Sequence, residues 1–123
     1  MTPHSFDKTP ALQDLLAKAD KIGVYAADFA GSPSGEFGHP GDDTGRCAVA
    51  AFEAHGPDAA ADVLMRFAKS YNGTARKNGA ELVTADKLLN TCGMALSVKL
   101  SKEEIASVKN ALAAKLSGVT GPI

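Results

Sequence analysis

The spacing of apolar residues constrains the fold of this chain more than any other feature. In residues 10–31, apolar side chains recur every three or four positions, which places them along one face of a helix. No segment alternates apolar and polar residues as a half-buried strand does. The segments with the helical period are residues 10–31, 45–55, 57–72, 85–98 and a last stretch that opens at Ser101. The sequence therefore predicts an all-α fold of about five helices.

Local signals indicate where several of these helices begin and end. Thr84 precedes the fourth helical segment and can cap it. Ser101 and Glu104 have the spacing of a capping box, in which each side chain bonds a backbone N–H of the other residue. The dipeptide Asn72–Gly73 is typical of a helix end, so we expect the third helix to close there and a polar connector to follow.

The chain is predicted to form a single compact domain over residues 1–123, because its 123 residues are one domain's worth. Residues 1–8 are expected to form an N-terminal arm. Residues 31–45 contain five glycines and two prolines, a composition that predicts a long flexible loop between the first and second helices. A cap at Asp43 or Thr44 would then start the second helix.

Composition and cysteine content favour a cytoplasmic protein. No run reaches the roughly 18 apolar residues needed to span a bilayer, and the first residues lack the pattern of a secretory signal. The two cysteines, Cys47 and Cys92, are too few and too far apart for a disulfide scaffold. We expect no membrane association and no cofactor.

Charge is divided unevenly along the chain. Residues 1–62 hold ten acidic and four basic residues, whereas residues 63–123 hold nine basic and four acidic ones. This asymmetry indicates either an interaction surface or two halves that attract each other within the fold. The segment 63–80 contains no acid, and its candidate binding residues are Arg66, Lys69, Tyr71, Arg76 and Lys77.

The basic segment 63–80 fits either a phosphate backbone or an acidic partner. A pI near 6.3 argues against a dedicated nucleic-acid binder. The alternative is a solvated helix face and connector with no partner. Helical spacing also places Tyr71 on the apolar face of residues 57–72, together with Phe67.

Cys47 is the one candidate nucleophile. If the second helix starts at Asp43 or Thr44, Cys47 lies in its first turn and follows Arg46, and both features stabilise a thiolate. A nucleophile also needs a base within hydrogen-bond reach. His55 lies eight residues further on, about 12 Å along a helix, so it does not serve. The alternative is a small buried thiol.

The stretch before Cys47 offers three candidate metal ligands, His39, Asp42 and Asp43. One nitrogen and two carboxylates suit a transition metal. Their spacing matches neither a calcium loop nor the paired patterns of zinc sites. Two adjacent acids at a helix start can equally cap the helix and complement its dipole.

The function that these patterns favour is binding rather than catalysis. We expect a small, soluble, non-enzymatic helical protein that binds another macromolecule, a protein in preference to nucleic acid. One alternative is a thiol- or metal-dependent enzyme centred on the 35–47 loop and Cys47. Another is a binder of nucleic acid or of an acidic partner through residues 63–80.

Overall fold

The computed structural model describes residues 11–30, 38–97, 99–119 and 121–123. Over these ranges the chain is all-α, as predicted, and the only β pairing is an isolated bridge between Thr84 and Pro122. The five helices are α1 (Leu12–Ala30), α2 (Gly38–His55), α3 (Pro57–Asn78), α4 (Ala85–Leu96) and α5 (Lys102–Lys115).

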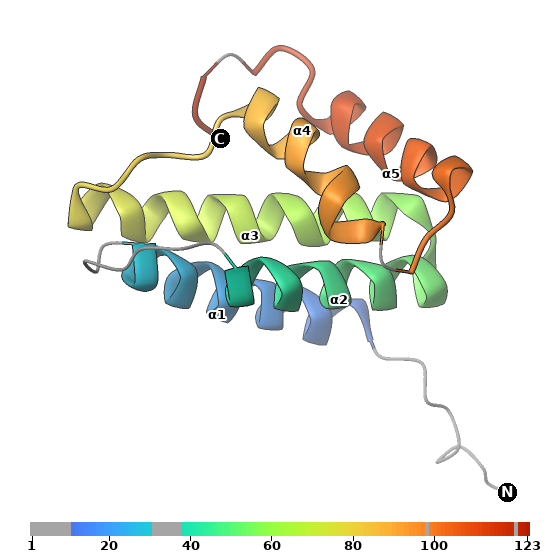
Figure 1. Cartoon of the computed structure of the whole chain (residues 1–123), viewed down its shortest axis with the longest axis horizontal. Helices are drawn as coiled ribbons and strands as arrows, with labels where there is room; N and C mark the ends of the chain where they lie inside the picture. Colours follow the sequence, from blue (N-terminus) through green and yellow to red (C-terminus); the bar gives the residue numbers. More distant parts are fainter. Residues whose placement is uncertain (1–10, 31–37, 98, 120) are drawn as a thin grey trace, which may run out of the picture.

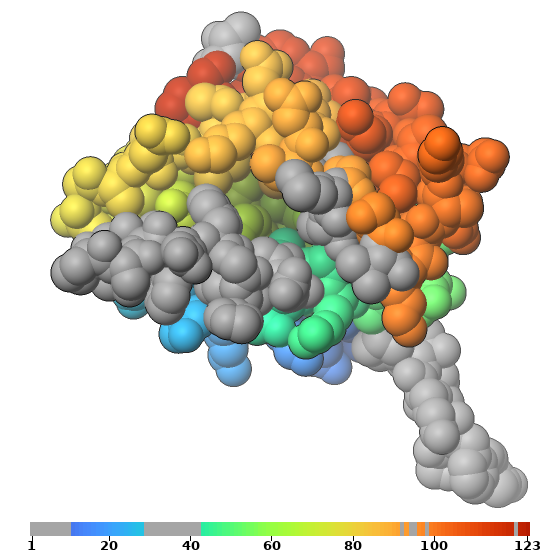
Figure 2. Space-filling model, viewed as in Figure 1, coloured from blue at the N-terminus to red at the C-terminus, as the bar shows by residue number. Residues whose placement is uncertain are grey.

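Helix α3 is the centre of the fold. Helices α1 and α2 pack along one side of it, while α4 and α5 lie across the other side (Figure 1). In the space-filling view, α4 and α5 form a continuous surface above α3 (Figure 2). α3 therefore contacts every other helix, and its sequence must supply apolar side chains in more than one direction.

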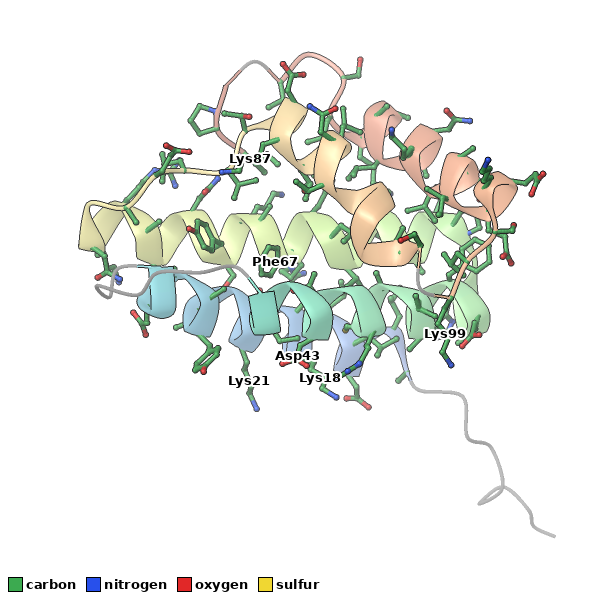
Figure 3. All side chains as sticks on the ribbon, in the orientation of Figure 1. Lys18, Lys21, Asp43, Phe67, Lys87 and Lys99 are labelled. Carbon is green, nitrogen blue, oxygen red and sulfur yellow. The ribbon has the colours of Figure 1, made fainter. Side chains whose placement is uncertain are left out.

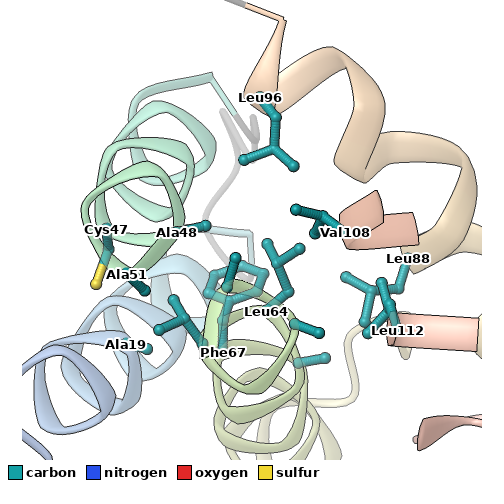
Figure 4. Close-up of a cluster of buried hydrophobic side chains, with 14 of the residues drawn as sticks. Ala19, Cys47, Ala48, Ala51, Leu64, Phe67, Leu88, Leu96, Val108 and Leu112 are labelled. Carbon is teal, nitrogen blue, oxygen red and sulfur yellow. The ribbon is translucent and has the colours of Figure 1, made fainter. Parts of the chain in front are cut away.

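The core is built from aliphatic and small side chains, because the chain has no Trp and few aromatics. On α3, Leu64 and Phe67 lie between the α1–α2 side and the α4–α5 side (Figure 4). Leu96 from α4 and Leu112 from α5 are fully buried opposite them. Alanines such as Ala19 fill the contacts on the α1–α2 side, which lets these helices approach closely.

Two of the predicted helix starts are confirmed. The Thr84 side chain accepts a hydrogen bond from the Lys87 backbone N–H and caps α4. The capping box of α5 is complete, because Ser101 accepts from the Glu104 N–H at 3.2 Å and Glu104 accepts from the Ser101 N–H at 2.8 Å. Both caps supply acceptors for N–H groups that have no partner within the helix.

The predicted end of the third helix at Asn72–Gly73 is wrong. α3 continues to Asn78 and ends at Gly79, whose φ of 72° is the left-handed conformation typical of a helix C-cap. Asn72 is fully buried, and the apolar face resumes beyond it at Ala75. Tertiary packing therefore outweighs the weak local preference of an Asn–Gly pair to end a helix.

The buried Asn72 side chain joins three parts of the chain. Its Nδ2 donates to the Val83 carbonyl at 3.0 Å and to the Ile123 carbonyl at 2.9 Å. Its Oδ1 accepts from the Val83 N–H at 2.7 Å. The Ile123 N–H in turn donates to the Val83 carbonyl at 3.1 Å. Asn72 thus holds both the α3–α4 connection and residues 121–123 against α3.

The predicted boundary of the 31–45 loop is also corrected. α2 begins at Gly38, so residues 38–45 are helical and neither Asp43 nor Thr44 is its cap. Residues 31–37 and the 1–8 arm lie outside the described ranges. Pro40 is compatible with this earlier start, because the first N–H groups of a helix need no helical partner. Burial of Thr44 and Gly45 shows that packing stabilises this part of α2.

Helices α1 and α3 lie in close contact at Gly23. A Cβ atom at this position would lie 2.7 Å from the Phe67 carbonyl oxygen and 2.7 Å from the Ser70 Cβ. The Ser70 hydroxyl donates to the Asp20 carbonyl of α1 at 2.6 Å, which fixes the same crossing. The contact requires glycine because part of the obstacle is backbone, which cannot rotate away.

Candidate functional site

Four basic residues predicted from the sequence share one outward face of α3. Arg66, Lys69, Arg76 and Lys77 are all exposed, and separations of three, seven and one positions bring them to the same side of a helix. We call these four side chains the basic face. Arg66 and Lys77 lie about 16 Å apart along the helix axis, since each residue adds 1.5 Å.

Tyr71, the fifth candidate binding residue, does not belong to the basic face. It is only 3% exposed, and its ring centroid lies 6.1 Å from that of Phe67. Positions 67 and 71 are one turn apart on the inner side of α3, which is why the side chain points into the core. Burial raises the pKa of the Tyr71 hydroxyl, and the nearby Glu81 carboxylate raises it further. The structure therefore corrects the sequence-based role of Tyr71.

Part of the charge asymmetry is satisfied within the fold. Arg66 pairs with Asp20 at 3.2 Å and Lys115 pairs with Asp62 at 2.9 Å, and both pairs join the acidic half to the basic half. No ion pair with a described acidic residue involves Lys69, Arg76 or Lys77. These three cations therefore remain directed to solvent on the basic face.

Cys47 lies in the middle of α2 rather than in its first turn. Because the helix starts at Gly38, Cys47 follows nine residues of helix and gains nothing from an N-terminal dipole. Its side chain is 4% exposed, and its Sγ donates to the Leu15 carbonyl of α1 at 3.2 Å. Burial raises the pKa of the thiol, and the positive charge of Lys18 opposes this only in part.

The environment of Cys47 is thus that of a packing group. Its thiol fills the contact between α1 and α2 beside Ala48 and Ala51 (Figure 4). His55, which was considered as a base for Cys47, is the last residue of α2 and lies two turns further along the same helix, as the sequence predicted. Burial and a raised thiol pKa both lower the fraction of reactive thiolate at neutral pH.

We expect slow alkylation of Cys47 by iodoacetamide in the native protein. The folded state keeps the thiol protonated and out of solvent, so the reaction should be much faster in urea than in buffer. The measurement is mass spectrometry of the Cys47 peptide after timed labelling across neutral and mildly alkaline pH. Rapid native labelling at neutral pH, equal to that in urea, would show an activated and accessible thiol instead.

A groove of about 300 Å³ lies directly outside Cys47, between α1 and α2. Sequence reasoning missed it, because its two walls come from helices that are separate in sequence. Lys18 projects outward from α1, and Asp43 lies on the adjacent part of α2 (Figure 3). The lining residues are Leu15, Lys18, Ile22, Asp43, Arg46, Cys47 and Ala50.

The three candidate metal ligands all fall at the start of α2. Asp43 makes a 3.4 Å ion pair with Arg46, one turn along the helix. The side chains of His39 and Asp42 lie outside those that the structure describes. Among the described side chains, no three His, Cys, Asp or Glu residues gather where they could hold a metal ion.

Comparison with protein-family models, with curated proteins and with solved structures finds no match to this chain. None of the helices in the described ranges combines the length and apolar character that crossing a bilayer requires.

Proposed function

We propose that this protein is a non-enzymatic helical protein that binds another macromolecule, an acidic protein, through the basic face of α3. The observation that carries the proposal is the alignment of Arg66, Lys69, Arg76 and Lys77 on one side of a single long helix. α3 is held by contacts with all four other helices, so these charges are presented on a rigid element. A fixed row of cations complements a negatively charged surface and speeds its encounter.

Neighbouring charges favour an acidic protein over nucleic acid as the partner. Asp20 lies beside Arg66, and Asp28 accepts a hydrogen bond from Asn78 at the end of α3. A continuous phosphate backbone would meet these carboxylates, whereas a protein surface can place its own basic or polar groups opposite them. The formal net charge of the whole chain is also -1, which opposes nonspecific binding to nucleic acid.

The enzyme alternative centred on Cys47 receives less support. Its premise was a thiol in the first turn of a helix, and Cys47 instead lies buried in mid-helix with a raised pKa. Binding through α3 needs no such activation. It requires only exposed charge on a stable scaffold.

The proposal predicts salt-sensitive binding of a glutamate-rich peptide. Replacing Lys69, Arg76 and Lys77 with Gln should weaken binding by about tenfold, since each exposed charge pair contributes up to about 1 kcal/mol. Raising the salt from about 0.1 M to about 1 M shortens the Debye length from about 10 Å to about 3 Å and should weaken the wild type similarly. Fluorescence anisotropy of the labelled peptide measures both effects.

A matched control removes the same charge elsewhere. Lys99, Lys102 and Lys109 are exposed in or near α5, and changing them to Gln alters the net charge by the same amount. This control should bind the peptide as the wild type does. Equal loss in both triple variants would show a net-charge effect, and preferential binding of a DNA duplex would favour the nucleic-acid alternative. Either result contradicts the proposal.

A further inference from the structure

The groove between α1 and α2 has an apolar floor and a charged mouth. α1 contributes Leu15, Lys18 and Ile22, which lie three and four positions apart and so share one face. α2 contributes Cys47 and Ala50 from the opposite wall. Leu15 and Cys47 are almost fully buried, while Ile22 and Ala50 are half-buried and line the open part of the groove.

The described side chains at the mouth of the groove carry an excess of positive charge. Arg46 and Asp43 form a 3.4 Å ion pair in which both side chains are mostly exposed, so water screens the pair and Arg46 can turn toward a ligand. Lys18 lies on the opposite wall and makes no ion pair with a described carboxylate. Among the described side chains that line the groove, two cations and one carboxylate therefore surround an apolar hollow.

From this arrangement we infer that the groove binds a small amphipathic carboxylate, a molecule with one anionic group and a short hydrocarbon chain. The carboxylate lies between Lys18 and Arg46, and the chain covers Ile22 and Ala50 above the Cys47 thiol. A volume of about 300 Å³ is at the lower end of the range for small-ligand sites, so the ligand is short.

This site is independent of the binding surface proposed on α3. The groove lies on the side of α1 that faces α2, whereas Asp20 reaches from the other side of α1 to Arg66. A ligand in the groove leaves Lys69, Arg76 and Lys77 untouched. The two proposals can therefore fail separately.

Octanoate is the probe that tests the inference, with octanol and octylammonium as neutral and cationic matches of the same chain length. Titration into ¹⁵N-labelled protein should shift the amide signals of Lys18, Ile22, Cys47 and Ala50. Octanol should bind about fivefold more weakly than octanoate, because it lacks the charge that meets the two cations, and octylammonium more weakly still. Saturating octanoate should also slow alkylation of Cys47.

Two variants and their controls separate a specific site from nonspecific binding. Ala50→Phe fills the groove and should abolish the octanoate shifts, whereas Ala113→Phe on the exposed face of α5 should not. Lys18→Gln should weaken octanoate binding about fivefold, whereas Lys109→Gln should leave it unchanged. Equal affinity for octanoate and octanol, or octanoate shifts that survive both groove variants, would overturn the inference.

Discussion

Gly23→Ala should destabilise the protein by about 1–3 kcal/mol, the usual effect of overpacking a tight contact. The new Cβ would lie 2.7 Å from the Phe67 carbonyl oxygen, a distance that real Cβ atoms do not adopt. α1 and α3 would have to separate, which would disturb the largest helix contact in the fold and the bond from Ser70 to the Asp20 carbonyl. Urea unfolding followed by far-UV circular dichroism measures the change.

The same substitution at Gly73 is the control, and it should have the opposite sign. Gly73 also lies inside a helix, but a Cβ there would meet nothing within 4 Å. Alanine is the better helix former by about 1 kcal/mol, so Gly73→Ala should stabilise the protein by up to that amount. If Gly23→Ala left the free energy of unfolding unchanged or raised it, as Gly73→Ala should, α1 and α3 would not meet as described.

Asn72→Ala should lower the free energy of unfolding by about 3 kcal/mol. The change removes both hydrogen bonds to Val83 and the one to Ile123, and it leaves a buried N–H without a partner. An unsatisfied buried polar group costs about 1–3 kcal/mol, and the lost side-chain volume adds a cavity. Amide hydrogen exchange should accelerate at Val83 and Ile123 in particular, because Asn72 holds both segments.

Asn110→Ala is the matched control, since Asn110 is exposed on α5. It should change stability by less than about 0.5 kcal/mol, or raise it slightly through helix propensity. Equal effects of the two asparagine substitutions would contradict the buried network at Asn72. Unchanged hydrogen exchange at Val83 would contradict it as well.

The fold class was predictable because it depends on local information. The three-to-four-residue period of apolar side chains needs only neighbouring positions, and so do the caps at Thr84 and Ser101. Two predicted helix boundaries were wrong, the start of α2 and the end of α3. At both, contacts between residues far apart in the sequence determine where the helix begins or ends. Asn72–Gly73 remains helical because the Asn72 side chain forms hydrogen bonds with residues 11 and 51 positions away in the sequence. Patterns among neighbouring residues do not reveal such distant partners.

The candidate surfaces were predictable to a smaller extent. Helical spacing placed Lys69 on the outward side of the third helix and Tyr71 on its inner side. Arg76 and Lys77 were expected in a connector, and they join the basic face because α3 continues to Asn78. The position of Cys47 was misjudged because it depended on where α2 starts. The groove outside Cys47 is formed by two helices together, so it could be found only once their packing was known.

Affinity capture from source-cell lysate tests the central claim most directly. The wild type, the triple Gln variant at Lys69, Arg76 and Lys77, and the control triple variant near α5 are immobilised side by side. We predict at least one acidic protein that the wild type and the control retain, that the α3 variant loses, and that high salt elutes. The same set of proteins on all three, unaffected by salt, would contradict binding through the basic face.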